Sequence, residues 1–322
     1  MATTTQINVM HSVTANVIQG MQRNGNFGGM EIAKPISQAS LSANWPVIRI
    51  ADNFGIQDVL EDRALGAAFK RLEATINLDT SVVSGEGCEI PVDKTIIEDQ
   101  SKSGLDILSA FGMALMKAAY IRHEKKVAAI AQGADFDSVN SGTAYTNANK
   151  ATADAPEDIL GAIERVNGRG ENPDTIVIPV EVWARIRMQD RMRAFIAGSV
   201  NPGAMVTAAN LASAFADEGI KRVVIGRGRV NTANKGKAAA IAPIWANTHI
   251  WVGSSDLGAE TGDANSLGNS IATFYREEQP APYFIENYYD DKIRSEVIRV
   301  YGETNVKVIN AQAGTRIATQ FA

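Results

Sequence analysis

The longest helical pattern in the chain covers residues 105–132 and constrains any fold that contains it. Six apolar side chains recur there at the spacing of one helix face: Leu105, Leu108, Phe111, Leu115, Ala118 and Ala119. Ser103 stands where an N-cap is expected, and Asp106 holds the capping-box position. At about 1.5 Å per residue the helix would extend roughly 40 Å, which is long for a globular protein. The pattern therefore predicts one unusually long helix.

Before this helix, apolar residues alternate with polar ones. The alternation runs through Ile76 and Leu78, breaks at residues 84–87 (Ser-Gly-Glu-Gly), and resumes through Ile90 and Val92. This predicts a β-hairpin spanning roughly residues 65–97. Its flanks carry Lys70, Arg71, Glu73, Glu89, Asp93 and Lys94, and its closing strand contains Pro91. A charged ribbon with a proline suits an exposed edge, so we expect it to find its partner on another subunit. Deleting residues 75–92 should then leave a folded subunit that no longer assembles.

The second half alternates between helical and strand patterns. Helices are predicted at residues 156–166, 181–195 and 208–216, and strands at residues 175–179, 221–225, 238–242 and 249–252. Further strands are predicted at residues 283–289, 292–301 and 305–310, with a short one after Gly314. The chain is therefore expected to adopt a mixed α+β fold.

The first 45 or so residues differ from the rest in composition. They are rich in glycine and in small polar residues, with one short helical stripe at Val9, Val13, Val17 and Met21. Such a segment buries little surface by itself, and we expect an arm that is mobile unless it lies across a neighbour. Up to residue 48 its only charged residues are Arg23, Glu31 and Lys34. It is not a basic arm of the kind that holds a nucleic acid.

Charge and cysteine content narrow the function classes. The net charge of −5 argues against tight, sequence-independent binding to nucleic acid, which depends on clustered Lys and Arg. No apolar run approaches the roughly 20 residues of a membrane-spanning helix, and residues 1–10 lack the features of an export signal, so we expect a soluble protein. The single cysteine, Cys88, excludes an internal disulfide framework and suits a reducing cytoplasm.

The residues that carry chemistry do not form a recognisable constellation. His11, His123 and His249 lie more than a hundred residues apart, and none has a carboxylate or cysteine at metal-ligand spacing. The glycine motifs at residues 226–228 (Gly-Arg-Gly) and 236–237 (Gly-Lys) miss the spacing of dinucleotide- and phosphate-binding loops. Glu286, Asp290 and Asp291 could serve acid–base chemistry, but acidic residues beside a strand are more often solvated or salt-bridged. We therefore predict no catalytic residue, no cofactor and no metal.

Three segments in the second half resemble the major capsid proteins of tailed bacteriophages. Residues 173–179 leading into 182–186 look like a strand and helix of that family's axial domain. Residues 226–233, running on to 244–246, resemble a stretch common in these proteins. Residues 295–301 with 306–310 resemble a strand of their peripheral domain. Their order, after an arm, a hairpin and a long helix, is similar to the Johnson fold, which encapsulin compartments also use.

The resemblance implies a division of the chain. It assigns residues 1–57 to an N-terminal arm, 58–102 to an extended loop, 103–157 with 280–308 to a peripheral domain, and 158–279 with 309–322 to an axial domain. In this scheme the long helix is the spine of the peripheral domain. Inter-subunit contacts are expected in the loop and the arm, at Phe69, Lys70, Arg71, Glu73, Glu89, Asp93, Lys94, Val13 and Val17.

The implied function is structural. Hexamers and pentamers of the chain would form an icosahedral shell around double-stranded DNA in a virion, after synthesis in the host cytoplasm. Separate scaffolding, portal and decoration proteins are possible partners, and nothing before the arm resembles a coiled-coil scaffolding segment. Two alternatives stay open: an encapsulin-type compartment, and a soluble α/β enzyme with a site scattered in sequence. Electron microscopy of particles and size-exclusion chromatography would separate them.

Overall fold

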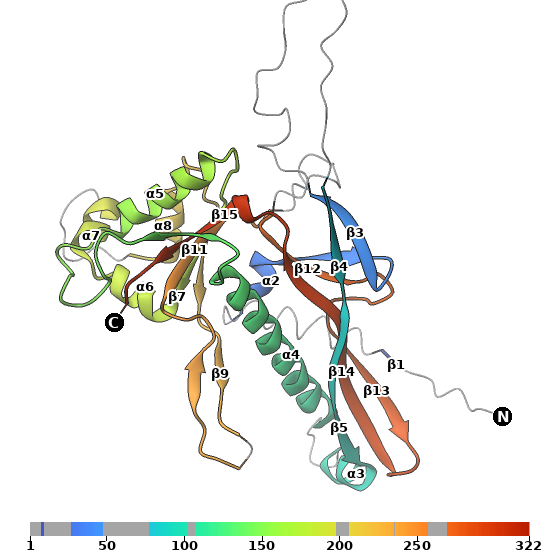
Figure 1. The fold of residues 1–322 in the computed structure, drawn as a ribbon. Helices are drawn as coiled ribbons and strands as arrows, with labels where there is room; N and C mark the ends of the chain where they lie inside the picture. Colours follow the sequence, from blue (N-terminus) through green and yellow to red (C-terminus); the bar gives the residue numbers. More distant parts are fainter. Residues whose placement is uncertain are drawn as a thin grey trace, which may run out of the picture.

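The computed structural model describes residues 8–9, 27–47, 77–101, 107–197, 206–234, 236–256 and 269–321. Within these ranges the chain forms two main β-sheets, one on each side of the C-terminal end of a long helix (Figure 1). Two short two-stranded ribbons project from this body (Figure 1). The arrangement is α+β, as the sequence predicts.

The first sheet has six strands and packs against the long helix α4 (Ile107–Ala131). Its strands are β1 (Asn8–Val9), β13 (Phe284–Asp290), β14 (Ser295–Val308), β12 (Ile271–Arg276), β2 (Lys34–Gln38) and β5 (Ser84–Asp93). The helix buries Leu115, Met116 and Tyr120 against Ile285 and Ile298 of the sheet. The predicted long helix is thus confirmed.

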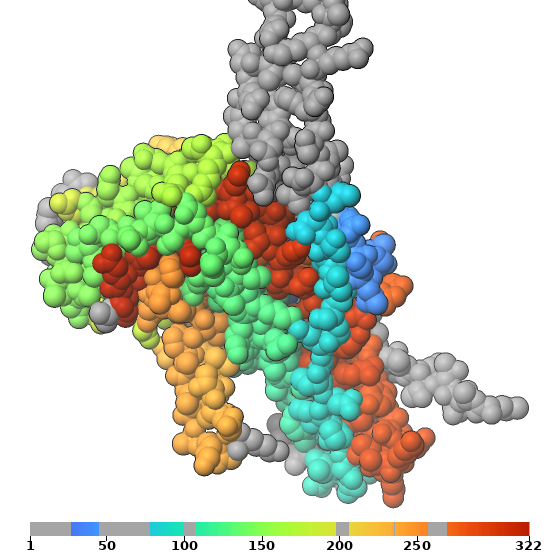
Figure 2. All heavy atoms as spheres, viewed as in Figure 1, coloured from blue at the N-terminus to red at the C-terminus, as the bar shows by residue number. Residues whose placement is uncertain are grey.

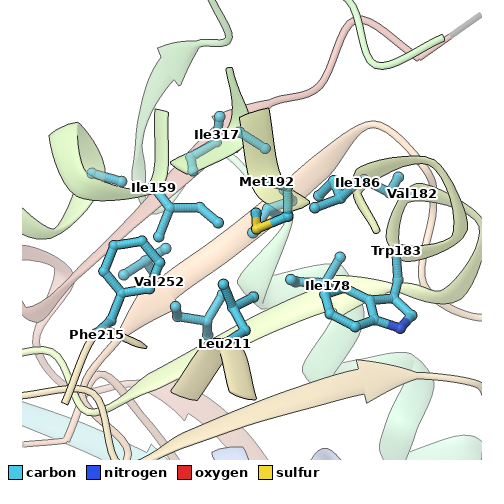
Figure 3. Close-up of a cluster of buried hydrophobic side chains, with 14 of the residues drawn as sticks. Ile159, Ile178, Val182, Trp183, Ile186, Met192, Leu211, Phe215, Val252 and Ile317 are labelled. Atoms are coloured by element: carbon cyan, nitrogen blue, oxygen red, sulfur yellow. The ribbon is translucent and has the colours of Figure 1, made fainter. Parts of the chain in front are cut away.

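The second sheet has five strands, in the order β6-β15-β11-β7-β8. These are β6 (Asp137–Asn140), β15 (Gly314–Ala318), β11 (His249–Gly253), β7 (Thr175–Pro179) and β8 (Arg222–Gly226). Its helices are α5 (Ala155–Asn167), α6 (Val180–Ile186), α7 (Asp190–Ala197) and α8 (Ala208–Ala214). Figure 3 shows how Ile159 of α5, Met192 of α7 and Phe215, just after α8, meet Ile178 and Val252 of the sheet. This apolar cluster is the largest core of the described chain.

Short elements complete the fold. They are α2 (Gly29–Ile32), α3 (Lys94–Ser101), the 3-10 turn η3 (Ala311–Ala313), and the two ribbons, β3 (Ser42–Val47) with β4 (Asn77–Val82) and β9 (Arg229–Asn231) with β10 (Ile241–Pro243). Among the described helices, none is long and apolar enough to cross a membrane.

The predicted hairpin over residues 65–97 is wrong in its pairing. β4 pairs with β3, and β5 pairs over its whole length with β14, where Ser84 lies opposite Thr304 and Asp93 opposite Ser295. The glycines predicted to form a turn are extended in β5, where they pair with β14. Gly87 permits a close approach of the two strands, because a Cβ there would stand only 2.7 Å from the carbonyl oxygen of Val300. β5 is therefore part of the six-stranded sheet, and removing residues 75–92 should unfold the subunit, contrary to the sequence-based expectation.

Pro91 has a simple place in this arrangement. β5 pairs with β14 alone among the described strands, so one of its edges is free of a ladder and tolerates a residue without an N–H. The prediction that Pro91 marks an edge strand is confirmed, although the sheet is a different one.

Part of the expected arm belongs to the body of the subunit. Residues 27–47 supply α2, β2 and β3, and Ile32 and Ala33 are fully buried in a core with Val127 and Trp251. The expectation of an arm that buries little surface is wrong for this part. β2 pairs in parallel with β12, which lies far away in sequence, so the sequence pattern alone gives no signal of this packing.

Two further differences concern the second half. The helix predicted at residues 181–195 is two helices, α6 and α7, and between them the buried side chain of Gln189 accepts a hydrogen bond from Ala155 N (3.3 Å). The strands β6 and β12 pair across the predicted domain boundaries, with β15 and β14 respectively. The boundaries themselves stay a prediction.

Candidate assembly surface

The β3–β4 ribbon exposes large apolar side chains. Leu78 is 69% exposed and Val82 is 58% exposed. They share one face of β4, because residues two and four apart along a strand point to the same side. Leu41, just before β3, is also exposed, and its carbonyl accepts a hydrogen bond from Val83 N (2.9 Å). A two-stranded ribbon with an apolar outer face is marginal alone and suits contact with another protein surface.

Six of the nine contact residues expected from the sequence lie outside the described residues: Val13, Val17, Phe69, Lys70, Arg71 and Glu73. Of the rest, Glu89 accepts a hydrogen bond from Tyr288 Oη (3.2 Å), and Lys94 Nζ lies 3.8 Å from Glu98. Asp93 accepts from Thr95 N (2.7 Å), and its hydrogen bonds to Thr95 hold its pKa below the ordinary value. All three therefore have partners within the subunit, and their contacts with other subunits stay a prediction.

A buried glutamate joins three parts of the fold. Glu124 of α4 accepts hydrogen bonds from Gly29 N (2.5 Å) and Gly28 N (3.3 Å) at the start of α2, and from Trp245 Nε1 (2.5 Å). Trp245 lies between β10 and β11. Burial raises the pKa of Glu124, against the opposing effect of these hydrogen bonds. A Cβ on Gly29 would come within 2.6 Å of Glu124 Oε2, so only glycine permits this approach.

A second contact, between charged side chains, links the two sheets. Asp256 follows β11 and receives Lys34 of β2 at 2.5 Å and Lys221, next to β8, at 2.9 Å. Hydrogen bonds from these two lysines lower the pKa of Asp256 to about 2. Together with Glu124, this carboxylate fixes how the five-stranded sheet sits relative to the six-stranded sheet.

A pocket of about 470 Å³ lies between β5 and α4. Its ionisable lining residues include Glu86, Arg122, Tyr283 and Cys88. Burial acts to raise the pKa of Glu86, but hydrogen bonds from Lys126 and Arg122 outweigh it, and the pKa is lowered. Burial raises the pKa of Cys88 and raises that of Tyr283 to about 12. These shifts favour an ion-paired carboxylate, a neutral thiol and a neutral phenol, which are poor starting states for general-base or nucleophilic chemistry.

His123 of α4 packs edge-on against Tyr283, which lines this pocket. His123 is buried and its Nε2 lies 2.8 Å from Thr273 Oγ1. Burial, helped by the charge of Lys126, lowers its pKa to about 3, so the ring is neutral at ordinary pH. Within the described ranges no group of three or more His, Cys, Asp and Glu residues could hold a metal ion.

The two sheets and the long helix together have the arrangement of a known fold. A six-stranded sheet with one long helix, joined to a five-stranded sheet flanked by helices, is the Johnson fold of phage capsid proteins and encapsulins, as the sequence resemblance implied.

Comparison with solved structures bears this out. A phage-related protein from Bordetella bronchiseptica is 16% identical, with 98% of each chain covered and a TM-score of 0.67. The capsid of cyanophage P-SCSP1u is 12% identical over 100% of this chain and 90% of that one, with a TM-score of 0.53. A virus-like particle from Pyrococcus furiosus is 8% identical over 95% and 98%, with a TM-score of 0.55. No protein-family model and no curated protein matches the sequence.

Sequence reasoning missed the residues that the structure brings forward. The alternating pattern marks Leu78 only as a strand residue, and it gives no role to Val82. Their spacing of four, on a strand beside a glycine-rich segment, was the available signal. Glu124 gave none, because a glutamate in a long helix ordinarily faces water.

Proposed function

We propose that this chain is the major capsid protein of a tailed bacteriophage. In this proposal copies of the chain assemble into hexamers and pentamers, which close into an icosahedral shell around double-stranded DNA. The chain acts as a structural protein and not as an enzyme. The likeness of its fold to the solved capsid of cyanophage P-SCSP1u and to a phage-related protein supports the proposal.

The observation that carries the proposal furthest is the apolar outer face of the β3–β4 ribbon. A subunit that leaves Leu78 and Val82 in water has surface available for burial by a neighbour. Each copy needs several such surfaces, because a shell is held by many interfaces per subunit. The β3–β4 ribbon brackets residues 48–76, and those from 58 onward fall within the proposed extended loop, residues 58–102.

The further parts of the proposal follow the family's division of the chain. Residues 1–57 would be an N-terminal arm, 103–157 with 280–308 a peripheral domain, and 158–279 with 309–322 an axial domain. Scaffolding, portal and decoration proteins would be separate partners. The net charge of −5 suits a shell that encloses DNA without adsorbing it. The protein would be made in the host cytoplasm and reside in the virion.

Negative-stain electron microscopy of the purified full chain tests this function. Closed shells of uniform diameter, or rings of five and six subunits, are the expected result. Size-exclusion chromatography with light scattering gives the mass of the same sample. A monomer or small oligomer over a wide range of protein and salt concentrations, with no shells, would refute the proposal.

A compartment that encloses protein cargo is the second candidate. The fold likeness to a virus-like particle from Pyrococcus furiosus, at a TM-score of 0.55, is compatible with this candidate as well as with a capsid. Particles recovered after expression distinguish the two candidates by their contents. Nuclease-protected DNA supports a capsid, whereas a stoichiometric protein cargo supports a compartment.

A further inference from the structure

One stretch of the chain has a charge opposite to that of the rest. Residues 219–255 contain six of the 31 basic residues and none of the 36 acidic ones, so the remaining sequence carries a net charge of −11. The stretch includes β8, β9, β10 and β11. Its middle forms the β9–β10 ribbon, which projects from the five-stranded sheet as a protrusion of the molecular surface (Figures 1 and 2).

The outer face of this ribbon combines cations with an apolar side chain. Arg229 pairs with Pro243, and Asn231 pairs with Ile241, so these four residues share one face. Ile241 is 57% exposed. Arg227, two residues before Arg229, is exposed as well. Within the described part of the chain, the guanidinium groups of Arg227 and Arg229 have no ion-pair partner.

The ribbon is held in a defined shape despite its exposure. Ile244 N donates to Gly228 O (2.8 Å) and Thr232 N donates to Ala240 O (2.8 Å). The side chain of Asn231 accepts hydrogen bonds from Ala233 N and Ala240 N, both at 3.0 Å. An ordered ribbon loses little conformational entropy when it binds, which favours a docking role over that of a loose loop.

A complementary surface lies on α5. Glu157, Gly161 and Glu164 are exposed and follow the three- and four-residue spacing of one helix face. A Cβ on Gly161 would have no atom within 4 Å, so there is open space between the two carboxylates. Neither carboxylate has a hydrogen-bond or ion-pair partner among the described residues.

The position of α5 suits a second copy of the chain. In Figure 1, α5 lies along the upper side of the five-stranded sheet, whereas the β9–β10 ribbon points away from it on the lower side. Two complementary patches on opposite sides of one subunit can form a heterologous interface, which generates a ring when the rotation between copies closes. Glu157 and Glu164 are about 10 Å apart along the helix, and Arg227 and Arg229 about 7 Å apart along the chain, within mutual reach of long side chains.

We infer that the β9–β10 ribbon of one copy docks on the α5 face of the next, with Arg227 and Arg229 against Glu157 and Glu164 and with Ile241 over Gly161. This inference rests on the proposed function, because it names one contact that would close the capsomer ring. The rest of the chain is negatively charged, so another copy attracts the basic ribbon. The same negative charge repels nucleic acid, which favours a second copy as the partner.

Charge reversal with compensation tests the contact in the full chain. Arg227→Glu/Arg229→Glu and, separately, Glu157→Arg/Glu164→Arg should each reduce the fraction of subunits in rings and shells at least tenfold. The variant with all four substitutions should restore that fraction to within about threefold of wild type. The matched control Lys117→Glu/Lys125→Glu makes the same charge change at two exposed lysines of α4 and should assemble normally.

The outcomes separate this inference from the proposed function. Wild-type chain without rings or shells would refute the function. Wild-type shells together with normal assembly of the ribbon variant would overturn the inference alone. The inference would also be overturned if the double variants lose assembly and the variant with all four substitutions does not regain it. Normal shells that retain less nucleic acid would assign the ribbon to nucleic acid and overturn it as well.

Thermal unfolding shows whether the charge-reversal variants fold. If one of them does not, a variant with neutral substitutions keeps the test decisive. Arg227→Gln/Arg229→Gln removes the attraction without adding repulsion. Its ring dissociation constant should depend less on salt concentration than that of the wild type. An unchanged salt dependence would overturn the inference.

Discussion

Removing the carboxylate of Glu124 should loosen the joint between α2, α4 and the segment around Trp245. Glu124→Ala leaves three buried N–H donors without an acceptor: Gly28 N, Gly29 N and Trp245 Nε1. An unsatisfied buried donor costs about 1–3 kcal/mol. Part of this loss is offset, because the alanine variant no longer carries the cost of burying a carboxylate. That cost is also what raises the pKa of Glu124. We expect a net loss of about 3 kcal/mol in the free energy of unfolding.

Thermal unfolding of unassembled subunits measures this loss. For a chain of this size about 3 kcal/mol corresponds to a fall in Tm of roughly 4 °C. Glu124→Gln keeps one acceptor oxygen, but its NH₂ group faces N–H donors that need an acceptor. The free energy of unfolding should therefore fall by about 2 kcal/mol. The control Lys125→Ala, at the exposed neighbouring position, should change stability by less than about 0.5 kcal/mol. A fall in Tm below about 1 °C for Glu124→Ala would refute the reasoning.

The pKa of Glu124 gives this prediction a pH dependence. A carboxyl group whose folded-state pKa is raised contributes stability that is complete below its ordinary pKa and is lost as the pH rises through the folded-state pKa. Glu124→Gln does not titrate. The advantage of the wild type over Glu124→Gln should therefore be larger at pH 4 than at pH 8. An advantage that grows with pH would contradict the direction of the shift.

Two further predictions concern the second inter-sheet contact and the β3–β4 ribbon. Asp256→Asn should cost about 1 kcal/mol at neutral pH, since Asp256 and its two lysines are partly exposed. Its lowered pKa means that the stabilisation is complete above about pH 4 and is lost as the pH falls toward about 2, so Tm values of variant and wild type should converge there. Leu78→Asp/Val82→Asp should leave the subunit folded but abolish shells in electron micrographs, because both side chains are exposed in the subunit.

Each of these has a clear contrary result. A Tm difference for Asp256→Asn that stays constant down to pH 2.5 would exclude the ion pair as its source. For the ribbon variant, Ala148→Asp is a control that adds a charge at an exposed loop position without removing apolar surface. Shells of normal yield from Leu78→Asp/Val82→Asp would exclude the β3–β4 ribbon from the interfaces.

Local sequence patterns determined the elements that rely on local interactions. The helical spacing of apolar residues around Leu115 predicts α4, since a helix forms hydrogen bonds only within its own segment. Its buried face differs from the predicted stripe, because Phe111 and Ala118 are exposed. The continuous apolar run at residues 175–179 specifies β7, all of whose residues are buried. The order of these elements was also enough to suggest the Johnson fold.

Tertiary structure decided which strands pair and which polar groups meet. Gly85 and Gly87 suggest a turn to any local rule, yet the partner of β5 lies about two hundred residues further along the chain, where β14 offers a full antiparallel ladder. The same holds for Glu124, whose donors come from residues 28–29 and 245. A sequence pattern reports the period of one segment, whereas pairing and burial depend on the surfaces of segments that meet only after folding.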